Sequence, residues 1–545
     1  MMPTLPSMQT LLHRSLLRRR SCCTFSCLTA LLLESALAQV SQPPTFSNEL
    51  LGQGPALAAP APATVITPSI DIRAIATNKA LVDSSGNNRK DVIVEIQPGI
   101  AIEHRGPHAT LRGSLAVSEL GYLNNSDESR FLARARLDLS AKLVDNLLYL
   151  DAWLRVDPTF QDSLASRADA ASSYLLQPQK RANVSPFVRR QINESESVLA
   201  KVDYSVAHVT DLVTKAQTKT SRLQNSFLFE HQPRPFGYSI EANTETETND
   251  LVQTRALDTR EARLWLTASA SSALVFGIVG GRERVSLGSG ATTGSIYGGR
   301  LRWQPTDRTN INSQVERRYF GTGWQTTVAH HSPTFAVDLG MGRTVSSQDT
   351  PTAVFAKGQS VAAVLDAILV TRFPDPNLRQ QEVDRIIATS GLPSVATDAI
   401  AIYSTTAQIR QNASLQLGLL GKRNIVYAQV AFLKQIALEL PGQTIPMTAE
   451  YDSLQRSATV GWNLRLTALT TTNLSAEWSR LVRTGGVQAG QYAEQAALRG
   501  EVVLTLSPRS TATVGARRLT IRSNFLNATD SAPETAAYAG LRHRF

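Results

Sequence analysis

The sequence predicts an all-β protein, a transmembrane antiparallel up-and-down β-barrel of about 18–22 strands. Three observations predict it: apolar and polar residues alternate over long segments, the connections between those segments alternate between short and long, and the chain ends on the aromatic Phe545. A tilted membrane strand needs about ten residues, whereas strands of soluble sandwiches are usually about half that length. A closed barrel also pairs every backbone group that would otherwise face lipid.

The N-terminal segment, residues 1–38, is expected to be a cleaved signal peptide. Arg14 and Arg18–Arg20 form a basic region, an apolar stretch follows from about Phe25 to Leu33, and Ala36–Ala38 fits the small-x-small cleavage rule. All three cysteines lie in this segment, so we expect the mature chain to have neither disulfides nor thiolate ligands. Residues 39–63 are rich in Pro and Ala and are expected to form a flexible periplasmic lead-in.

The barrel is expected to span residues 64–545, because the period of two persists there. In residues 131–140 the odd positions are Phe, Ala, Ala, Leu and Leu, and the even positions from 134 are Arg134, Arg136, Asp138 and Ser140. The same alternation recurs in 261–270, 407–419, 454–466 and 496–506. Such a strand has one apolar face and one wet face. A soluble sandwich gives the same local pattern; the strand length and the arginines on the wet faces favour the barrel.

The connections can be followed in order from a first strand at about 64–78 and a second at 92–104. Gly, Pro, Asn and Asp mark the tight turns. These turns are 105–107, 144–146, 232–235, 305–307, 331–333, 421–424 and 507–510. Between them lie the longer connections 83–90, 157–181, 210–220, 250–259, 346–403, 441–451 and 523–533. The count reaches 22 strands, which is even and leaves both ends of the barrel on the periplasmic side.

One long outer loop, residues 346–403, is expected to contain a helical hairpin. Val361, Val364, Leu365 and Ile368 fall at helical spacing, and a second apolar stripe of Val383, Ile386 and Ile387 follows an N-cap at Asp375. The apolar faces must be buried against something. Two interpretations stay open: a gate over the barrel mouth, with Val361, Leu365, Ile368 and Ile386 as its residues, or a self-packed decoration.

Positive charge is the main feature of the predicted lumen. The whole chain carries a net charge of +10. Residues 1–38 contain four Arg and one Glu, so the remaining chain carries about +7. A cationic lumen would favour anions, including acidic polysaccharide; the alternative is simple lumen solvation and contact with anionic lipid. Inward Asp138, Glu261, Glu316 and Glu501 are potential ion-pair partners. By the alternation, the inward cations are Arg134, Arg136, Arg263, Arg300, Arg302, Arg410, Arg465, Arg499, Arg542 and Arg544.

No motif of catalysis or cofactor binding emerges from the sequence. There is no Gly-x-Ser-x-Gly elbow, and the Gly-rich segment 288–294 lacks the Lys of a phosphate loop. The histidine pairs His104/His108 and His330/His331 have no acidic or Cys ligand cluster beside them. No basic cluster with interleaved aromatics is present for nucleic acid. We therefore expect no catalytic residues, no metal and no cofactor, and a protein that is not an enzyme.

The end of the chain is expected to be an assembly signal. Tyr538, Gly540 and Phe545 lie in a terminal alternating strand that stops on an aromatic. In bacterial outer-membrane barrels such a residue is the handle for the barrel-assembly machinery. His543 departs from this pattern, because a hydrophobic or aromatic residue usually stands at that position.

Five segments carry a resemblance to a known family: Arg317–Trp324, Ala329–Thr334, Val337–Arg343, Val370–Arg379 with Gly391–Pro393, and Leu541–Phe545. The series resembles the outer-membrane β-barrel family associated with PEP-CTERM/exosortase systems, whose members accompany exopolysaccharide loci. The resemblance covers about residues 64–545. It implies location in a Gram-negative outer membrane and a conduit or accessory role in exopolysaccharide export. The implied partners are outer-membrane lipid and exopolysaccharide or its export proteins. The alternative is a structural or adhesion barrel with a closed lumen, whose outer loops bind a surface polymer.

Overall fold

The computed structural model describes the chain from residue 63 to residue 545 with gaps. The gaps are 83–87, 126–128, 161–175, 211–216, 251–256, 289, 347–350, 404–406, 442–451, 487–488, 525–532 and, within 356–399, all but seven residues. The expected signal peptide and nearly all of the expected lead-in lie outside the described residues.

The described part of the chain forms 24 strands. They are β1 Ala63–Val82, β2 Asn88–Arg105, β3 Ala109–Tyr122, β4 Arg130–Val144, β5 Leu148–Phe160, β6 Leu176–Gln191, β7 Glu196–Thr210, β8 Gln217–His231, β9 Phe236–Asn249, β10 Leu257–Ser271, β11 Leu274–Leu287, β12 Gly290–Thr306, β13 Thr309–Arg318, β14 Gly321–His331, β15 Phe335–Ser346, β16 Pro351–Phe355, β17 Ile400–Tyr403, β18 Gln408–Leu420, β19 Asn424–Ala437, β20 Ser453–Arg465, β21 Thr470–Arg483, β22 Tyr492–Ser507, β23 Ser510–Ser523 and β24 Glu534–Arg544.

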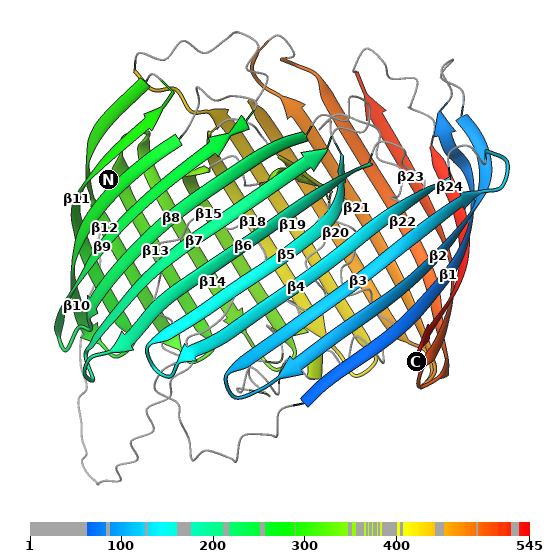
Figure 1. Ribbon diagram of the computed structural model, residues 1–545, viewed down its shortest axis with the longest axis horizontal. Helices are drawn as coiled ribbons and strands as arrows, with labels where there is room; N and C mark the ends of the chain where they lie inside the picture. The colour runs from blue at the N-terminus through cyan, green and yellow to red at the C-terminus, as the bar shows by residue number, and fades with distance from the viewer. Residues whose placement is uncertain are drawn as a thin grey trace, which may run out of the picture.

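Twenty-two of these strands form one antiparallel barrel (Figure 1). Each strand pairs with its sequence neighbours, except that β15 pairs directly with β18. The ring closes where β1 pairs with β24, from Ser69 opposite Arg544 to Thr77 opposite Ala536. The expected all-β, up-and-down barrel of 22 strands is therefore confirmed. Closure leaves no unpaired edge, which is the condition for crossing lipid as strands.

Short and long connections lie at opposite rims. The short ones include Gly106–His108, Asp145–Leu147 and Gly421–Arg423, and all lie at the rim where β1 begins. Figure 1 shows the C-terminus at this same rim. The strand ends that precede the longer connections lie at the other rim. Two connections at the long-loop rim are exceptions, because only two residues separate β11 from β12 and only Tyr319 and Phe320 separate β13 from β14.

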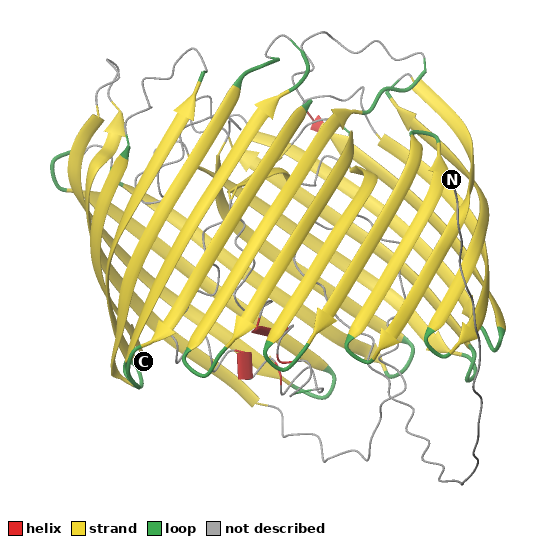
Figure 2. Cartoon of the chain, turned by 180° about the vertical axis from the view of Figure 1, so that it is seen from behind, coloured by secondary structure: helices red, strands yellow, loops and turns green. Residues whose placement is uncertain are grey.

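The outer face of the barrel is apolar. On β10, Leu264 and Leu266 are 45% and 52% exposed, and Ile278 on β11 and Val460 on β20 are similarly exposed. Large apolar side chains on the outside of a closed strand ladder are typical of outer-membrane barrels. The chain is thus an outer-membrane β-barrel, and the strands tilt across the wall as Figure 2 shows.

The segment between β15 and β18 differs from its sequence prediction. Its described backbone includes a separate two-stranded antiparallel sheet, β16 with β17, which the sequence did not indicate. Helical conformation is confined to a few described residues, among them Leu365, Leu369 and Val383, so the expected helical hairpin is not shown as an element. Among the described residues, no helix is long and apolar enough to cross a membrane.

Candidate functional site: the inner wall of the barrel

The inner wall is defined by the strand register. Residues directly opposite each other in an antiparallel pair point to the same side. Asn243 on β9 is opposite Glu261 on β10, which is opposite Glu283 on β11. These positions alternate with the exposed Leu264 and Leu266, so they face inward. Carried around the closed ring, the same rule assigns an inner face to each barrel strand.

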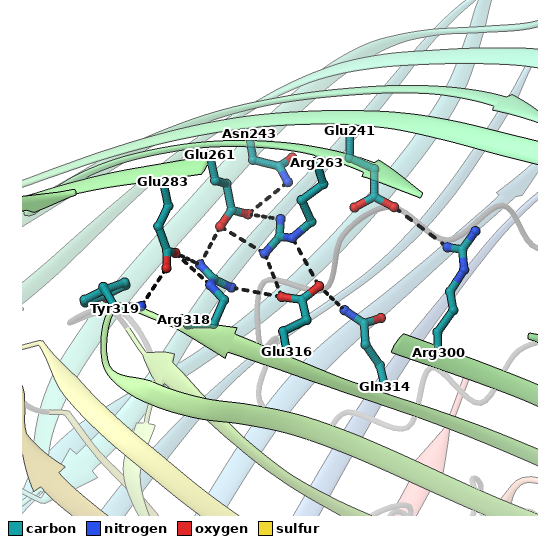
Figure 3. Close-up of polar contacts among 10 residues, drawn as sticks. All are labelled: Glu241, Asn243, Glu261, Arg263, Glu283, Arg300, Gln314, Glu316, Arg318 and Tyr319. Atoms are coloured by element: carbon teal, nitrogen blue, oxygen red, sulfur yellow. Dashed lines mark hydrogen bonds and ion pairs between the residues drawn. The ribbon is translucent and has the colours of Figure 1, made fainter. Parts of the chain in front are cut away.

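One part of this wall, on β9–β13, is a network of opposite charges (Figure 3). Arg263 on β10 pairs with Glu261 at 2.7 Å and, across the two intervening strands, with Glu316 on β13 at 3.2 Å. Arg318 pairs with Glu261 at 2.6 Å and with Glu283 at 2.7 Å. We call the network the charged cluster; its members are Glu241, Asn243, Glu261, Arg263, Glu283, Arg300, Gln314, Glu316 and Arg318.

Most members of the charged cluster are buried, and they pair with one another. The side chain of Glu283 is fully buried, and that of Arg263 is 4% exposed. Gln314 donates to Glu316 at 2.8 Å, and Asn243 donates to Glu261 at 3.1 Å. Removing one partner from such a network leaves an unpaired buried charge, which costs several kcal/mol. The charged cluster is therefore built as a unit.

Two glycines make room for the contact between Arg263 and Glu316. Gly281 lies opposite Arg263 and Gly298 lies opposite Glu316, on the two strands in between. A Cβ at Gly281 would lie 2.3 Å from the carbonyl oxygen of Ala262, and one at Gly298 would lie 2.0 Å from that of Val315. Only glycine fits at these positions, and its missing side chain lets the arginine reach across.

The β13–β14 turn is tied to the charged cluster. The backbone N–H of Tyr319 donates to Glu283 at 2.6 Å. Arg343 on β15 donates to the carbonyl of Phe320 at 3.3 Å and lies 5.4 Å from the centre of its ring. Gly321 has a φ of +103°, in the left-handed region that favours glycine. This turn lies within the segment Arg317–Trp324, and these contacts explain the Tyr-Phe-Gly in that segment.

Two apolar clusters also face the lumen near the long-loop rim. One joins Leu257, Val285 and Leu287 to Ala407, Leu438 and Leu440, with Tyr319 and Phe320 packed against it. The other contains Ile75, Ile93, Leu120, Tyr122 and Ala536. Sequence alternation did not reveal these clusters, because it predicts a wet inner face along the whole strand. They form since the side chains pack on one another across strands rather than on water.

A second stretch of the inner wall, on β18–β20, is polar but almost uncharged. Its inward charges among the described residues are Arg410 towards the long-loop rim and Arg465 at the other end. Amide and hydroxyl side chains both donate and accept hydrogen bonds. We call this stretch the neutral wall; its residues are Gln408, Asn412, Ser414, Gln416, Gln429, Gln435, Gln455, Ser457, Thr459 and Asn463.

The ten cations of the sequence prediction all occupy inward register positions. The structure brings two of them into the charged cluster: Arg263, and Arg300, which pairs with Glu241 at 3.9 Å and lies 4.5 Å from the Trp265 ring centre. The other eight are spread over the wall: Arg134 and Arg136 on β4, Arg302 on β12, Arg410 on β18, Arg465 on β20, Arg499 on β22, and Arg542 and Arg544 on β24, where Arg542 pairs with Asp71 at 2.7 Å. Their effect on ion selectivity stays a prediction.

Several expected acid partners do pair, although others were missed. Glu261 and Glu316 pair with Arg263, and Asp138 pairs with Arg155. Sequence reasoning missed Glu241, Glu283 and Arg318. A usable signal was present: Glu261-x-Arg263 and Glu316-x-Arg318 each place opposite charges two residues apart, which is the same face of a strand.

Strand β17 lies across the barrel from the strand that follows it in the sequence, β18. Strand β17 contacts β5, which lies on the opposite side of the ring from β15 and β18. The helical residues between β16 and β17 lie near the rim with the short turns in both views (yellow-green in Figure 1, red in Figure 2). Leu365 and Val383 are fully buried, and Arg379 pairs with Asp366 at 2.7 Å. Of the expected gate residues, Val361, Ile368 and Ile386 lie outside the described residues.

The expected assembly-signal residues lie on the last strand or just after it. The hydroxyl of Tyr538 points inward and donates to Glu501 at 3.0 Å. Gly540 is opposite Arg73 and Thr513. Phe545 follows β24 and is 62% exposed, and its N–H donates to the carbonyl of Pro68 at 3.0 Å. Its ring contacts that of His543 edge-on at 4.8 Å.

Metal binding has no support in the described part of the chain, where no three His, Cys, Asp or Glu residues are grouped to hold an ion.

Comparisons with known proteins concern the fold alone. No protein-family model matches the chain, and no curated protein matches it. It is similar to the siderophore receptor PirA from Acinetobacter baumannii, with 10% identity over 88% of this chain and 80% of that one and a TM-score of 0.45. The FrpB iron transporter from Neisseria meningitidis is 9% identical over 88% of this chain and 81% of that one, with a TM-score of 0.45. The ferric enterobactin receptor PfeA from Pseudomonas aeruginosa is 9% identical over 88% of this chain and 80% of that one, with a TM-score of 0.47. At these values the likeness adds nothing to what the strand pairing establishes.

Proposed function

We propose that this outer-membrane barrel is a conduit for a hydrophilic polymer, and that the polymer is an exopolysaccharide. The neutral wall carries the proposal. Register connects Gln416, Gln429 and Thr459 across three strands, and Ser414 lies with Ser457 in the adjacent row. A surface of amides and hydroxyls offers many equivalent donors and acceptors to sugar hydroxyls, without one deep binding site to hold the chain in place.

The sequence resemblance supports the choice of substrate. Residues Arg317–Trp324 resemble the exosortase-associated barrels that accompany exopolysaccharide loci, and this segment forms the β13–β14 turn on the lumen wall. We propose membership of that family on this basis. The outer-membrane lipid and the polysaccharide export proteins would then be the partners of the barrel.

The conduit would be closed in the conformation seen here. Inward residues of the neutral wall are buried; Gln416 and Thr459, for example, are each 4% exposed. Barrels of 22 strands are commonly plugged. The β16–β17 segment is the candidate plug, because β17 contacts β5 across the ring. Opening would require this segment to move, which makes it the gate of the proposal.

The proposal is tested with the purified barrel in liposomes. Residues 351–403 are replaced by a short Gly/Ser linker, and the release of fluorescent oligosaccharides of increasing length is compared with that from wild-type liposomes. We expect the variant to release oligosaccharides and the wild type to release little. The matched control replaces residues 161–175, another long connection, and should behave like the wild type.

Two results would argue against the conduit. A correctly assembled variant that releases no sugar would indicate a structural or adhesion barrel with a closed lumen. A barrel that passes a ferric siderophore but no oligosaccharide would instead place it with the iron receptors whose fold it shares.

We also propose that Phe545 is part of the signal for the barrel-assembly machinery. The side chain is exposed beside the rim where β1 and β24 meet, so it is accessible to a partner. Deleting Phe545 should reduce the amount of heat-modifiable barrel in the outer membrane, whereas deleting a residue of the 161–175 connection should not. Normal assembly without Phe545 would count against this role.

A further inference from the structure

Arg410 is a buried cation without a partner in the part of the chain that the structure describes. It faces inward from β18, and only 8% of its surface is exposed. Its Nε and Nη1 atoms are buried and make no hydrogen bond, and no ion pair links it to another described residue. Arg263 and Arg318, in contrast, each pair with two or more carboxylates.

The wall around Arg410 supplies no compensating charge. Its register partners are Thr344 on β15 and Gln435 on β19, and the next inward residues on β18 are Gln408 and Asn412. The inward neighbours on the flanking strands are also uncharged: Gly342, Ser346, Leu433 and Ala437. The arginine therefore has polar neighbours but no carboxylate among them.

Thr344 provides a second unused hydrogen-bonding group at the same place. Its Oγ1 atom is buried and has no hydrogen-bond partner. Because Thr344 is directly opposite Arg410, their Cβ atoms lie within about 4.5–5.5 Å and both side chains point to the same side. A guanidinium edge and a hydroxyl thus meet on one patch of the lumen wall.

We propose that Arg410 and Thr344 bind an oxyanion. A buried charge without a counter-charge is strongly unfavourable, so arginines inside proteins are normally paired. The planar guanidinium fits the two oxygens of a carboxylate or sulfate group in a bidentate manner. The hydroxyl of Thr344 can donate a further bond. The anion is either a free inorganic ion or the acidic group of a sugar; only the second source rests on the proposed function.

Calorimetric titration of the full-length barrel in detergent, in a zwitterionic low-salt buffer, tests the site. The probes are sodium sulfate, trigalacturonate and, as the neutral control, maltotriose. Wild type should bind sulfate and trigalacturonate saturably and should not bind maltotriose at this site. Arg410→Gln should weaken anion binding at least tenfold, and Thr344→Val should weaken it about threefold.

A matched variant controls for net charge. Arg518→Gln removes a cation from the exposed outer face of β23 and should leave both affinities unchanged. Should Arg410→Gln fail to fold, Thr344→Val still carries the test, since it conserves shape and removes only the hydroxyl. Tighter binding of trigalacturonate than of sulfate would identify an acidic sugar as the ligand, and the reverse order would identify a free anion.

The proposal is overturned if wild type binds neither anion saturably. It is also overturned if Arg410→Gln and Thr344→Val both bind as tightly as wild type. Sulfate binding does not depend on sugar transport, so failure of the conduit proposal would leave this result standing.

Discussion

Arg263 and Arg410 are both inward arginines of one barrel wall, yet their surroundings are opposite. Arg263 belongs to the charged cluster, where Glu261 and Glu316 satisfy its guanidinium. Arg410 belongs to the neutral wall and has amide and hydroxyl neighbours without a carboxylate. Arg263 is ion-paired with two carboxylates, whereas Arg410 has no ion pair among the described residues.

The difference shows that the number of cations on the inner face does not by itself give the electrostatic field of the lumen. The alternation assigned Arg263 and Arg410 to the same class. Pairing separates them, because a charge neutralised at 2.7 Å contributes little to the field that a passing ion experiences. The charged cluster is a structural part of the wall, whereas the neutral wall is where a ligand can compete for contacts.

The largest expected effect comes from breaking the charged cluster. Arg263→Met would leave Arg318 as the cation beside three buried carboxylates, Glu261, Glu283 and Glu316, so we expect a loss of about 3–5 kcal/mol in the free energy of unfolding. Urea unfolding of the purified barrel, followed by tryptophan fluorescence, measures this. A loss below about 1 kcal/mol would mean that the cluster does not support the wall as described.

The second effect concerns the two faces of the neutral wall. Val460 is 51% exposed on the outer face, and a charge at a lipid-facing position near the midplane costs about 2–4 kcal/mol. Thr459 faces inward, opposite Glu477. Val460→Arg should therefore reduce assembled barrel in membranes far more than Thr459→Arg. Equal tolerance of the two changes would contradict the assigned faces.

A single neutral hydrogen bond should matter less. Ser453 donates to Gln435 at 3.0 Å, and Ser453→Ala removes that bond. We expect a cost of about 0.5–1.5 kcal/mol in urea unfolding. A cost as large as that of Arg263→Met would show that the neutral wall is as tightly coupled as the charged cluster.

The smallest effect, and the opposite sign, is expected at Arg410. Arg410→Met removes a buried charge without orphaning a partner, so in anion-free buffer the free energy of unfolding should stay equal or rise by about 1 kcal/mol. Sulfate should stabilise the wild type and not the variant. A marked destabilisation by Arg410→Met in anion-free buffer would show that the residue has a structural partner.

The local sequence pattern was sufficient to predict the number of barrel strands and the face that each side chain takes. The period of two fixes which face each side chain takes, and tight turns such as Gly421–Arg423 fix where neighbouring strands reverse, so the count of 22 followed from the chain alone. Pairing across strands was harder. Arg263 meets Glu316 only because two intervening strands have glycine at Gly281 and Gly298, and no local pattern signals that.

The inner apolar clusters and the β16–β17 sheet could not be predicted from local sequence patterns for a related reason. Ile75, Ile93 and Leu120 face inward because they meet one another across β1–β3, which depends on register rather than on composition. β16 pairs with β17 across more than forty residues of intervening sequence. Helical spacing in between suggested a hairpin, but spacing alone does not show what a segment packs against.

The most direct test of the account is the single-channel conductance of the purified barrel in a planar bilayer. In the proposal, the lumen is polar on its neutral wall and is closed by the β16–β17 segment. Wild type should therefore show small or rare openings, and the variant with residues 351–403 replaced by a Gly/Ser linker should show a large, steady conductance. A wild-type barrel that is fully open, or a correctly assembled variant that stays silent, would contradict it.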